Sequence, residues 1–116
     1  MPPKSIIPDF TPAELDVVKQ TVRERYGKEV NVEEAEAEIR MYPDDRELTE
    51  VPCLYWAERG CQFVIFKVGE GRYRSQFFYS VREQYGTGRS EYDDILDCVL
   101  TLLRVQADHE AQRAGF

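Results

Sequence analysis

The clearest periodicity in the chain is the helical spacing of apolar residues between positions 15 and 26. The residues at this spacing are Leu15, Val18, Val22 and Tyr26. Thr11 stands three residues before Glu14, with Pro12 between them, which is the arrangement of a capping box at a helix start. Gly27 supplies a stop, because glycine readily adopts the left-handed conformation that ends helices. The pattern predicts a helix between Thr11 and Gly27.

Residues 33–42 carry a different pattern, in which charged residues alternate with apolar ones. In a strand, this alternation places Glu34, Glu36 and Glu38 on one face. The spacing of Val32, Ala35, Ile39 and Tyr42 also fits one face of a helix. Because the alternation is unbroken over eight residues, we favour a strand at the edge of a sheet. An acidic outer face would keep such a strand from pairing with other molecules.

Three further segments, residues 54–57, 61–68 and 72–80, are rich in aromatic and β-branched residues and predict antiparallel strands. A two-residue turn at Glu70-Gly71 would pair Gly69 with Arg72. The face that this register predicts as core consists of Val64, Phe66, Val68, Tyr73, Ser75, Phe77 and Tyr79. The opposite face consists of Lys67, Arg72, Arg74 and Gln76 near the turn, with Phe63, Ile65 and Phe78 further away. This second face is mixed in character and basic toward its tip.

The last predicted element is a helix that begins at a cap on Ser90, with Asp93 three residues later. Its inner stripe consists of Tyr92, Ile95, Leu96, Val99, Leu102 and Leu103. Leu100, Cys98 and Val105 widen the apolar arc, so this helix needs two neighbours. We favour the sheet and the first helix as these neighbours, and the alternative is the sheet and a second copy of the chain.

These elements predict a single α+β domain over residues 1–116. The expected order is an N-terminal helix, a three- or four-stranded antiparallel meander and a C-terminal helix, with both helices on one face of the sheet. Residues 1–9 are expected to form a loose arm, and residues 108–116, which lack an apolar period, a fraying tail.

The formal charge of −7 is distributed unevenly along the 116 residues. Residues 33–50 hold eight acidic against two basic residues, whereas residues 51–89 hold six basic against three acidic residues. The chain therefore has an acidic segment followed by a basic one. An acidic run of this kind can steer a basic partner toward the protein.

The sequence offers little for catalysis, metal binding or cofactor binding. His109 is the only histidine, and it lies among polar residues near the chain end, so it is a poor general base. Cys98 and His109 stand eleven residues apart on one predicted helix, roughly 16 Å at 1.5 Å per residue, too far to share one zinc ion. Cys53, Cys61 and Cys98 are expected to be buried and reduced. We predict no catalytic residues, no metal and no cofactor.

No stretch is apolar enough to span a membrane, and the first residues do not match a signal peptide, so a cytoplasmic location is expected. The function that the composition favours is a small, acidic, non-enzymatic regulatory module, an inhibitor or adaptor that binds a protein. A homodimer through the C-terminal helix is compatible with this function. The residues expected to contact the protein partner are Glu34, Glu36, Glu38, Tyr42, Asp44, Asp45 and Trp56.

The alternative function is nucleic-acid binding through the hairpin of residues 61–80. Its candidate residues are Lys67, Arg72, Arg74 and Phe78, since single strands are held by cations along the backbone and aromatic rings under the bases. We rank an enzyme third, because only a pocket that assembles distant polar groups would support one.

Overall fold

The computed structural model describes residues 7–115. Its elements are α1 (Pro12–Tyr26), β1 (Glu33–Ile39), β2 (Thr49–Glu58), β3 (Cys61–Gly69), β4 (Arg72–Ser80), β5 (Glu83–Tyr85) and α2 (Ile95–Arg113). The strands form one antiparallel sheet in the order β1-β2-β3-β4-β5, so each strand pairs with its neighbours along the chain. The α+β class is confirmed. The sheet has five strands rather than the predicted three or four, because β1 and the short β5 both join it.

The first helix follows its local signals closely. The Thr11 hydroxyl accepts a hydrogen bond from the Glu14 amide, and the Glu14 carboxylate accepts one from the Thr11 amide, which completes the predicted capping box. Gly27 ends the helix in the left-handed conformation, with φ of 68°. These predictions are confirmed, because each depends only on residues close in sequence.

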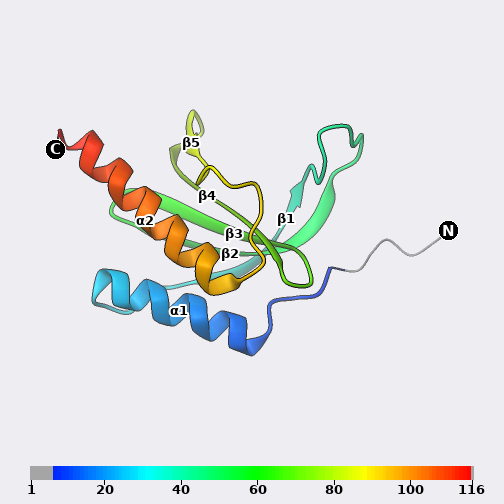
Figure 1. The fold of residues 1–116 in the computed structure, drawn as a ribbon, viewed down its shortest axis with the longest axis horizontal. Coiled ribbons are helices and arrows are strands. Elements are labelled where there is room, and N and C mark those ends of the chain that lie inside the picture. The colour runs from blue at the N-terminus through cyan, green and yellow to red at the C-terminus, as the bar shows by residue number, and fades with distance from the viewer. Residues whose placement is uncertain (1–6, 116) are drawn as a thin grey trace.

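Both helices lie on the same side of the sheet, where they pack against each other and cover its central strands (Figure 1). The core between these layers includes Val18 and Val22 from α1 and Val99 and Leu102 from α2. The sheet contributes Leu54, Trp56, Phe63, Ile65 and Phe77. The helix α1 therefore supplies the second neighbour that the wide apolar arc of α2 requires. No helix within residues 7–115 is long and apolar enough to cross a membrane.

The edge position predicted for the acidic alternating segment is confirmed. β1 pairs with β2 alone among the described strands, with Ala35 opposite Cys53 and Ala37 opposite Val51. Alternation decides between strand and helix here because, from Glu34 to Ile39, it places glutamates on one face and apolar residues on the other.

The predicted turn is correct, but the predicted faces of β3 are wrong. Gly69 pairs with Arg72 as expected, yet the register shifts between Lys67 and Gly69, so that Lys67 pairs with Tyr73. This irregularity exchanges the two faces of β3, because side chains alternate along a strand. Phe63, Ile65 and Lys67 therefore face the helices, whereas Val64 and Phe66 face away from them.

Both ends of α2 also differ from the prediction. Asp94, rather than Ser90, caps the helix by accepting a hydrogen bond from the Asp97 amide at 3.2 Å. Two backbone hydrogen bonds between Tyr73 and Tyr92 hold the chain in an extended conformation just before the helix. The helix therefore begins later in the sequence than predicted. The helix then continues beyond Ala107 to Arg113, because His109 packs against the rings of Tyr79 and Tyr85. Residues 1–6 of the predicted loose arm lie outside the described residues.

Candidate functional site

The strand β1 carries a continuous acidic surface at the edge of the sheet. We call this surface the acidic edge and define it as Glu34, Glu36, Glu38 and Glu50. The first three alternate along β1 and share a face, and Glu50 of β2 is the direct cross-strand partner of Glu38. All four side chains are exposed, so their negative charge reaches solvent.

No residue of the acidic edge forms an ion pair with another residue in the range 7–115. The carboxyl groups interact with one another instead. A hydrogen bond to Glu50 and the negative charges of Glu50 and Asp9 raise the pKa of Glu36, because proximity to like charges favours the protonated form. Among the described residues, the negative charge of the acidic edge therefore has no ion-pair partner.

The basic residues of the β3–β4 hairpin are arranged differently. Lys67 is buried, with a side chain only 3% exposed, and its ammonium donates hydrogen bonds to Glu14 Oε1 at 2.7 Å and to the Asp9 carbonyl at 2.9 Å. The hydroxyl of Tyr73 donates to the other Glu14 oxygen. Burial raises the pKa of Glu14, but the hydrogen bonds from Lys67 and Tyr73 outweigh burial and hold that pKa below its usual value. Lys67 thus fastens the start of α1 to the sheet.

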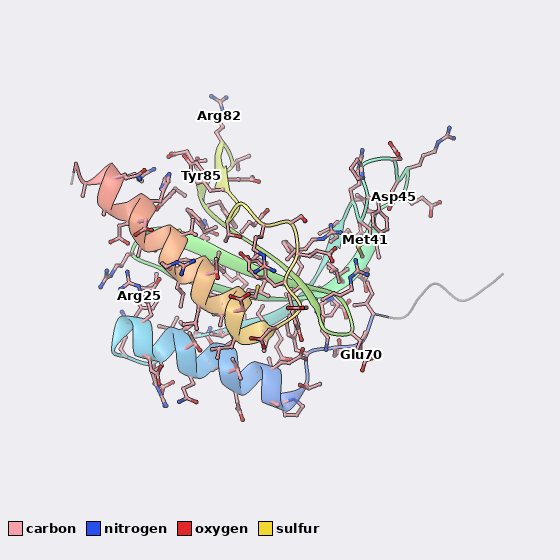
Figure 2. All side chains as sticks on the ribbon, viewed as in Figure 1. Arg25, Met41, Asp45, Glu70, Arg82 and Tyr85 are labelled. Atoms are coloured by element: carbon pink, nitrogen blue, oxygen red, sulfur yellow. The ribbon has the colours of Figure 1, made fainter. Side chains whose placement is uncertain are left out.

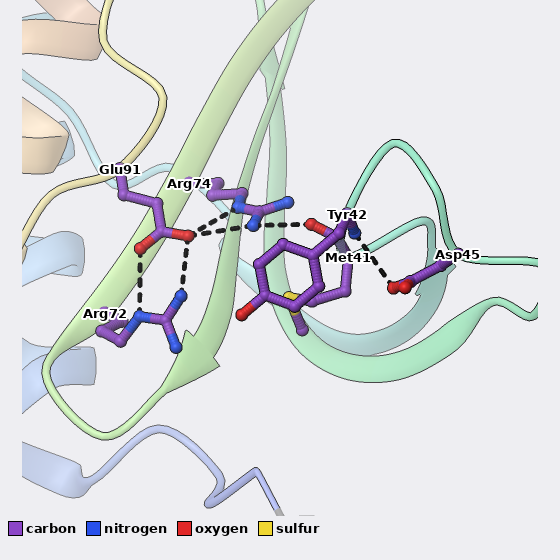
Figure 3. A network of polar contacts seen from close by, with 6 residues as sticks. All are labelled: Met41, Tyr42, Asp45, Arg72, Arg74 and Glu91. Carbon is purple, nitrogen blue, oxygen red and sulfur yellow. Dashed lines mark hydrogen bonds and ion pairs between the residues drawn. The ribbon is translucent and has the colours of Figure 1, made fainter.

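Arg72 and Arg74 both bind one carboxylate, that of Glu91 in the segment before α2 (Figure 3). Arg72 makes two hydrogen bonds to it, at 3.0 and 2.9 Å, and Arg74 makes two at 3.2 and 2.9 Å. These contacts, with those of Arg72 the strongest, lower the pKa of Glu91 and keep it ionised. Arg74 also donates to the Met41 carbonyl at 2.9 Å, so the cluster connects β4 to the β1–β2 loop.

The residues proposed for nucleic-acid binding therefore do not form one surface. Arg72, Arg74 and the half-buried Phe78 lie on the face of the sheet that points away from the helices. Lys67 lies on the opposite face, so its predicted position beside the two arginines is wrong. One carboxylate already binds the remaining pair of arginines.

The residues proposed for protein binding do not form one surface either. Glu34, Glu36 and Glu38 come together on the acidic edge, and Tyr42 and Asp44 are exposed on the β1–β2 loop. Asp45 holds that loop, because its carboxylate accepts a hydrogen bond from the Tyr42 amide at 3.1 Å. Figure 2 shows this loop, on which Met41 and Asp45 are labelled, projecting from the sheet. Trp56 does not lie on a surface that a partner could reach, because it is fully buried in the core, where its ring stacks on that of Phe63 with 5.2 Å between the ring centroids.

The face of the sheet away from the helices holds a trough that the sequence did not predict. It encloses about 520 Å³, and the residues that line it include Ala37 and Ile39 of β1, Phe66 of β3, and Arg74 and Gln76 of β4. The predicted register placed Phe66 in the core, so no sequence signal identified this trough. A second hollow, of about 600 Å³, lies under the β1–β2 loop beside Val68 and Arg72.

The cysteines are free and buried, as predicted. Burial raises the pKa of the Cys61 thiol to about 11 and that of Cys98 to about 12, so both stay protonated and unreactive near neutral pH. No group of three or more potential metal ligands occurs within the described part of the chain. His109 lies with Nδ1 3.3 Å from the Tyr79 hydroxyl and packs against neighbouring aromatic rings.

Comparisons of the chain with known protein families, with curated proteins and with solved structures give no significant match.

Proposed function

We propose that this chain is a small, acidic, non-enzymatic regulatory module of the cytoplasm, an inhibitor or adaptor that binds a basic surface of a protein partner through the acidic edge. One observation carries this proposal. The acidic edge has no internal counter-charge among the described residues, whereas the cations of the β3–β4 hairpin bind Glu14 and Glu91 within the protein. Uncompensated charge steers association and selects partners of opposite sign.

Nucleic-acid binding has weaker support for the same reason. A phosphate group that approaches Arg72 and Arg74 must compete with the Glu91 carboxylate, which already makes four hydrogen bonds with them. The acidic edge repels a polyanion as well. A homodimer through α2 is a second candidate assembly, supported by the exposed Leu96 and Leu100 on that helix.

The test is a tagged pull-down from lysate of the source organism, with and without nuclease, read by mass spectrometry. Three forms are compared: wild type, Glu34→Lys with Glu38→Lys, and Glu24→Lys with Asp108→Lys. The two variants change the net charge equally, but Glu24 and Asp108 are exposed residues of α1 and α2 rather than of β1.

We expect a stoichiometric protein partner that survives nuclease, is lost from the β1 variant and is retained by the helix variant. Equal retention by both variants would show that the acidic edge is not the binding surface. Partners that vanish with nuclease would favour the nucleic-acid alternative.

A further inference from the structure

The two edges of the sheet differ in length and in what they present to solvent. β5 has three residues, whereas β1 has seven and pairs only with β2 among the described strands. Half of the backbone N–H and C=O groups of an edge strand point away from its partner. The outer side of β1 is therefore a template on which another extended chain can form backbone hydrogen bonds.

The two faces of β1 specify which side chains such a chain would need. Glu34, Glu36 and Glu38 occupy one face, where a neighbouring strand would meet carboxylates. Ala35, Ala37 and Ile39 occupy the other face after Glu33 at its start, and Ala37 and Ile39 line the trough that Phe66 also lines. One face thus favours basic residues, and the other favours apolar ones.

A second copy of β1 fits this edge poorly. Pairing two copies would place a row of glutamates against an identical row, and like charges directly opposite in a sheet are destabilising. The pKa of Glu36 is already raised by Glu50 and Asp9 within one chain, so the edge resists further negative charge.

We propose that the partner contributes an extended segment, with basic and apolar residues in alternation, that adds to β1 as a sixth antiparallel or parallel strand. Its lysines or arginines lie beside the acidic edge, and its apolar residues continue the face formed by Ala35 and Ala37. Backbone hydrogen bonds along β1 supply affinity, and the alternation of side chains supplies specificity. This inference rests on the proposed function, because it specifies how the acidic edge binds its basic partner.

The test uses three synthetic peptides of seven residues, matched to the length of β1. The first alternates lysine and valine, with lysine at both ends. The second has the same composition but groups the lysines before the valines. The third has the alternating sequence with every backbone amide N-methylated, which keeps the charges and removes the hydrogen-bond donors. Binding is measured by fluorescence anisotropy, and amide exchange along β1 is followed by NMR.

We expect the alternating peptide to bind at least about tenfold more tightly than either control, because each control loses several interstrand hydrogen bonds or the side-chain match. It should also slow amide exchange at alternate residues of β1. The Glu34→Lys, Glu38→Lys variant should lose at least about tenfold in affinity for the alternating peptide, and the Glu24→Lys, Asp108→Lys variant should bind it like the wild type.

Equal binding of all three peptides, without altered exchange in β1, would overturn strand addition and leave the proposed function intact, since charge alone would then explain recognition. No measurable binding of the alternating peptide would also overturn it. A wild-type dimer whose contact protects the β1 amides would assign the edge to a second copy instead. The proposed function fails separately, if the pull-down partner is insensitive to the β1 charges.

Discussion

The acidic edge on β1 and the basic hairpin of β3 and β4 have opposite relationships to the rest of the fold. The hairpin cations are bound internally: Lys67 to Glu14 across the sheet–helix interface, and Arg72 and Arg74 to Glu91. The glutamates of the acidic edge have no such partners within residues 7–115. A count of charges along the sequence treats the two segments alike, whereas the fold pairs the hairpin cations internally and leaves the glutamates of the acidic edge exposed.

The two regions should also differ in how much their charges contribute to the free energy of unfolding. A buried charge must be paired, because removal of one partner leaves the other desolvated without compensation. An exposed charge contributes little to folding, whether or not it is paired. Substitutions in the hairpin should therefore change the free energy of unfolding, and substitutions on the acidic edge should change binding.

The largest effect is expected at Lys67. Lys67→Met should lower the free energy of unfolding by about 3 to 5 kcal/mol, because it leaves the Glu14 carboxylate buried beside an apolar side chain. Chemical denaturation measures this loss. The matched control is Lys19→Met on the exposed face of α1, which should change stability by less than about 0.5 kcal/mol.

Adding Glu14→Gln to Lys67→Met should restore part of the lost stability, because it removes the uncompensated charge and keeps an oxygen that accepts hydrogen bonds. A double variant less stable than Lys67→Met alone would contradict the assignment of the loss to an unpaired buried carboxylate.

A smaller effect on stability, but a new activity, is expected at Glu91. Glu91→Gln should lower the free energy of unfolding by about 1 to 2 kcal/mol, because the amide is uncharged and has only one oxygen to accept from the two arginines at this partly exposed site. It should also release Arg72 and Arg74 to bind phosphate. Anisotropy with a labelled single-stranded oligonucleotide should then show binding that weakens as salt rises.

The control for Glu91 is Glu83→Gln, which removes the exposed partner of Arg113 at the other end of the sheet. It should not increase oligonucleotide binding. If Glu91→Gln gained no affinity over this control, internal pairing would not be what keeps the hairpin from nucleic acid.

The sequence predicted those features whose causes are local. The bounds of α1 follow from Thr11, Glu14 and Gly27, which act within a few residues of the helix ends. The edge position of β1 follows from its alternation. The faces of β3 could not be predicted in this way, because residues 61–68 are apolar on most of both faces and either register buries a similar set. The contact that Lys67 makes with Glu14 and Asp9, more than fifty residues away, accompanies the register that the structure adopts.

The same reasoning explains the mixed result for the candidate site. The glutamates of the acidic edge were identified because a run of alternating charges predicts both a strand and its exposed face. Trp56 was selected by residue type, which indicates neither face nor burial. Leu54 lies two residues before Trp56, so the two side chains share a face of the strand. Because leucine at that position indicates the core face, the alternation could have placed Trp56 in the core.

The smallest effect on stability is expected for a substitution on the acidic edge, which should stabilise the fold slightly and weaken binding. The pKa of Glu36 is raised above its ordinary value of 4.5, mainly by Glu50. A carboxyl whose pKa is raised on folding favours the folded state below the unfolded pKa and loses that contribution as pH rises through the folded pKa.

Glu36→Gln should therefore slightly raise the melting temperature near neutral pH, and this gain should vanish below pH 4.5 and shrink in high salt. Thermal unfolding across pH measures the gain, and the same variant should bind the lysine–valine peptide more weakly than the wild type. If Glu36→Gln were more stable than the wild type and also bound the peptide as tightly, the Glu36 carboxylate would make no contribution to binding.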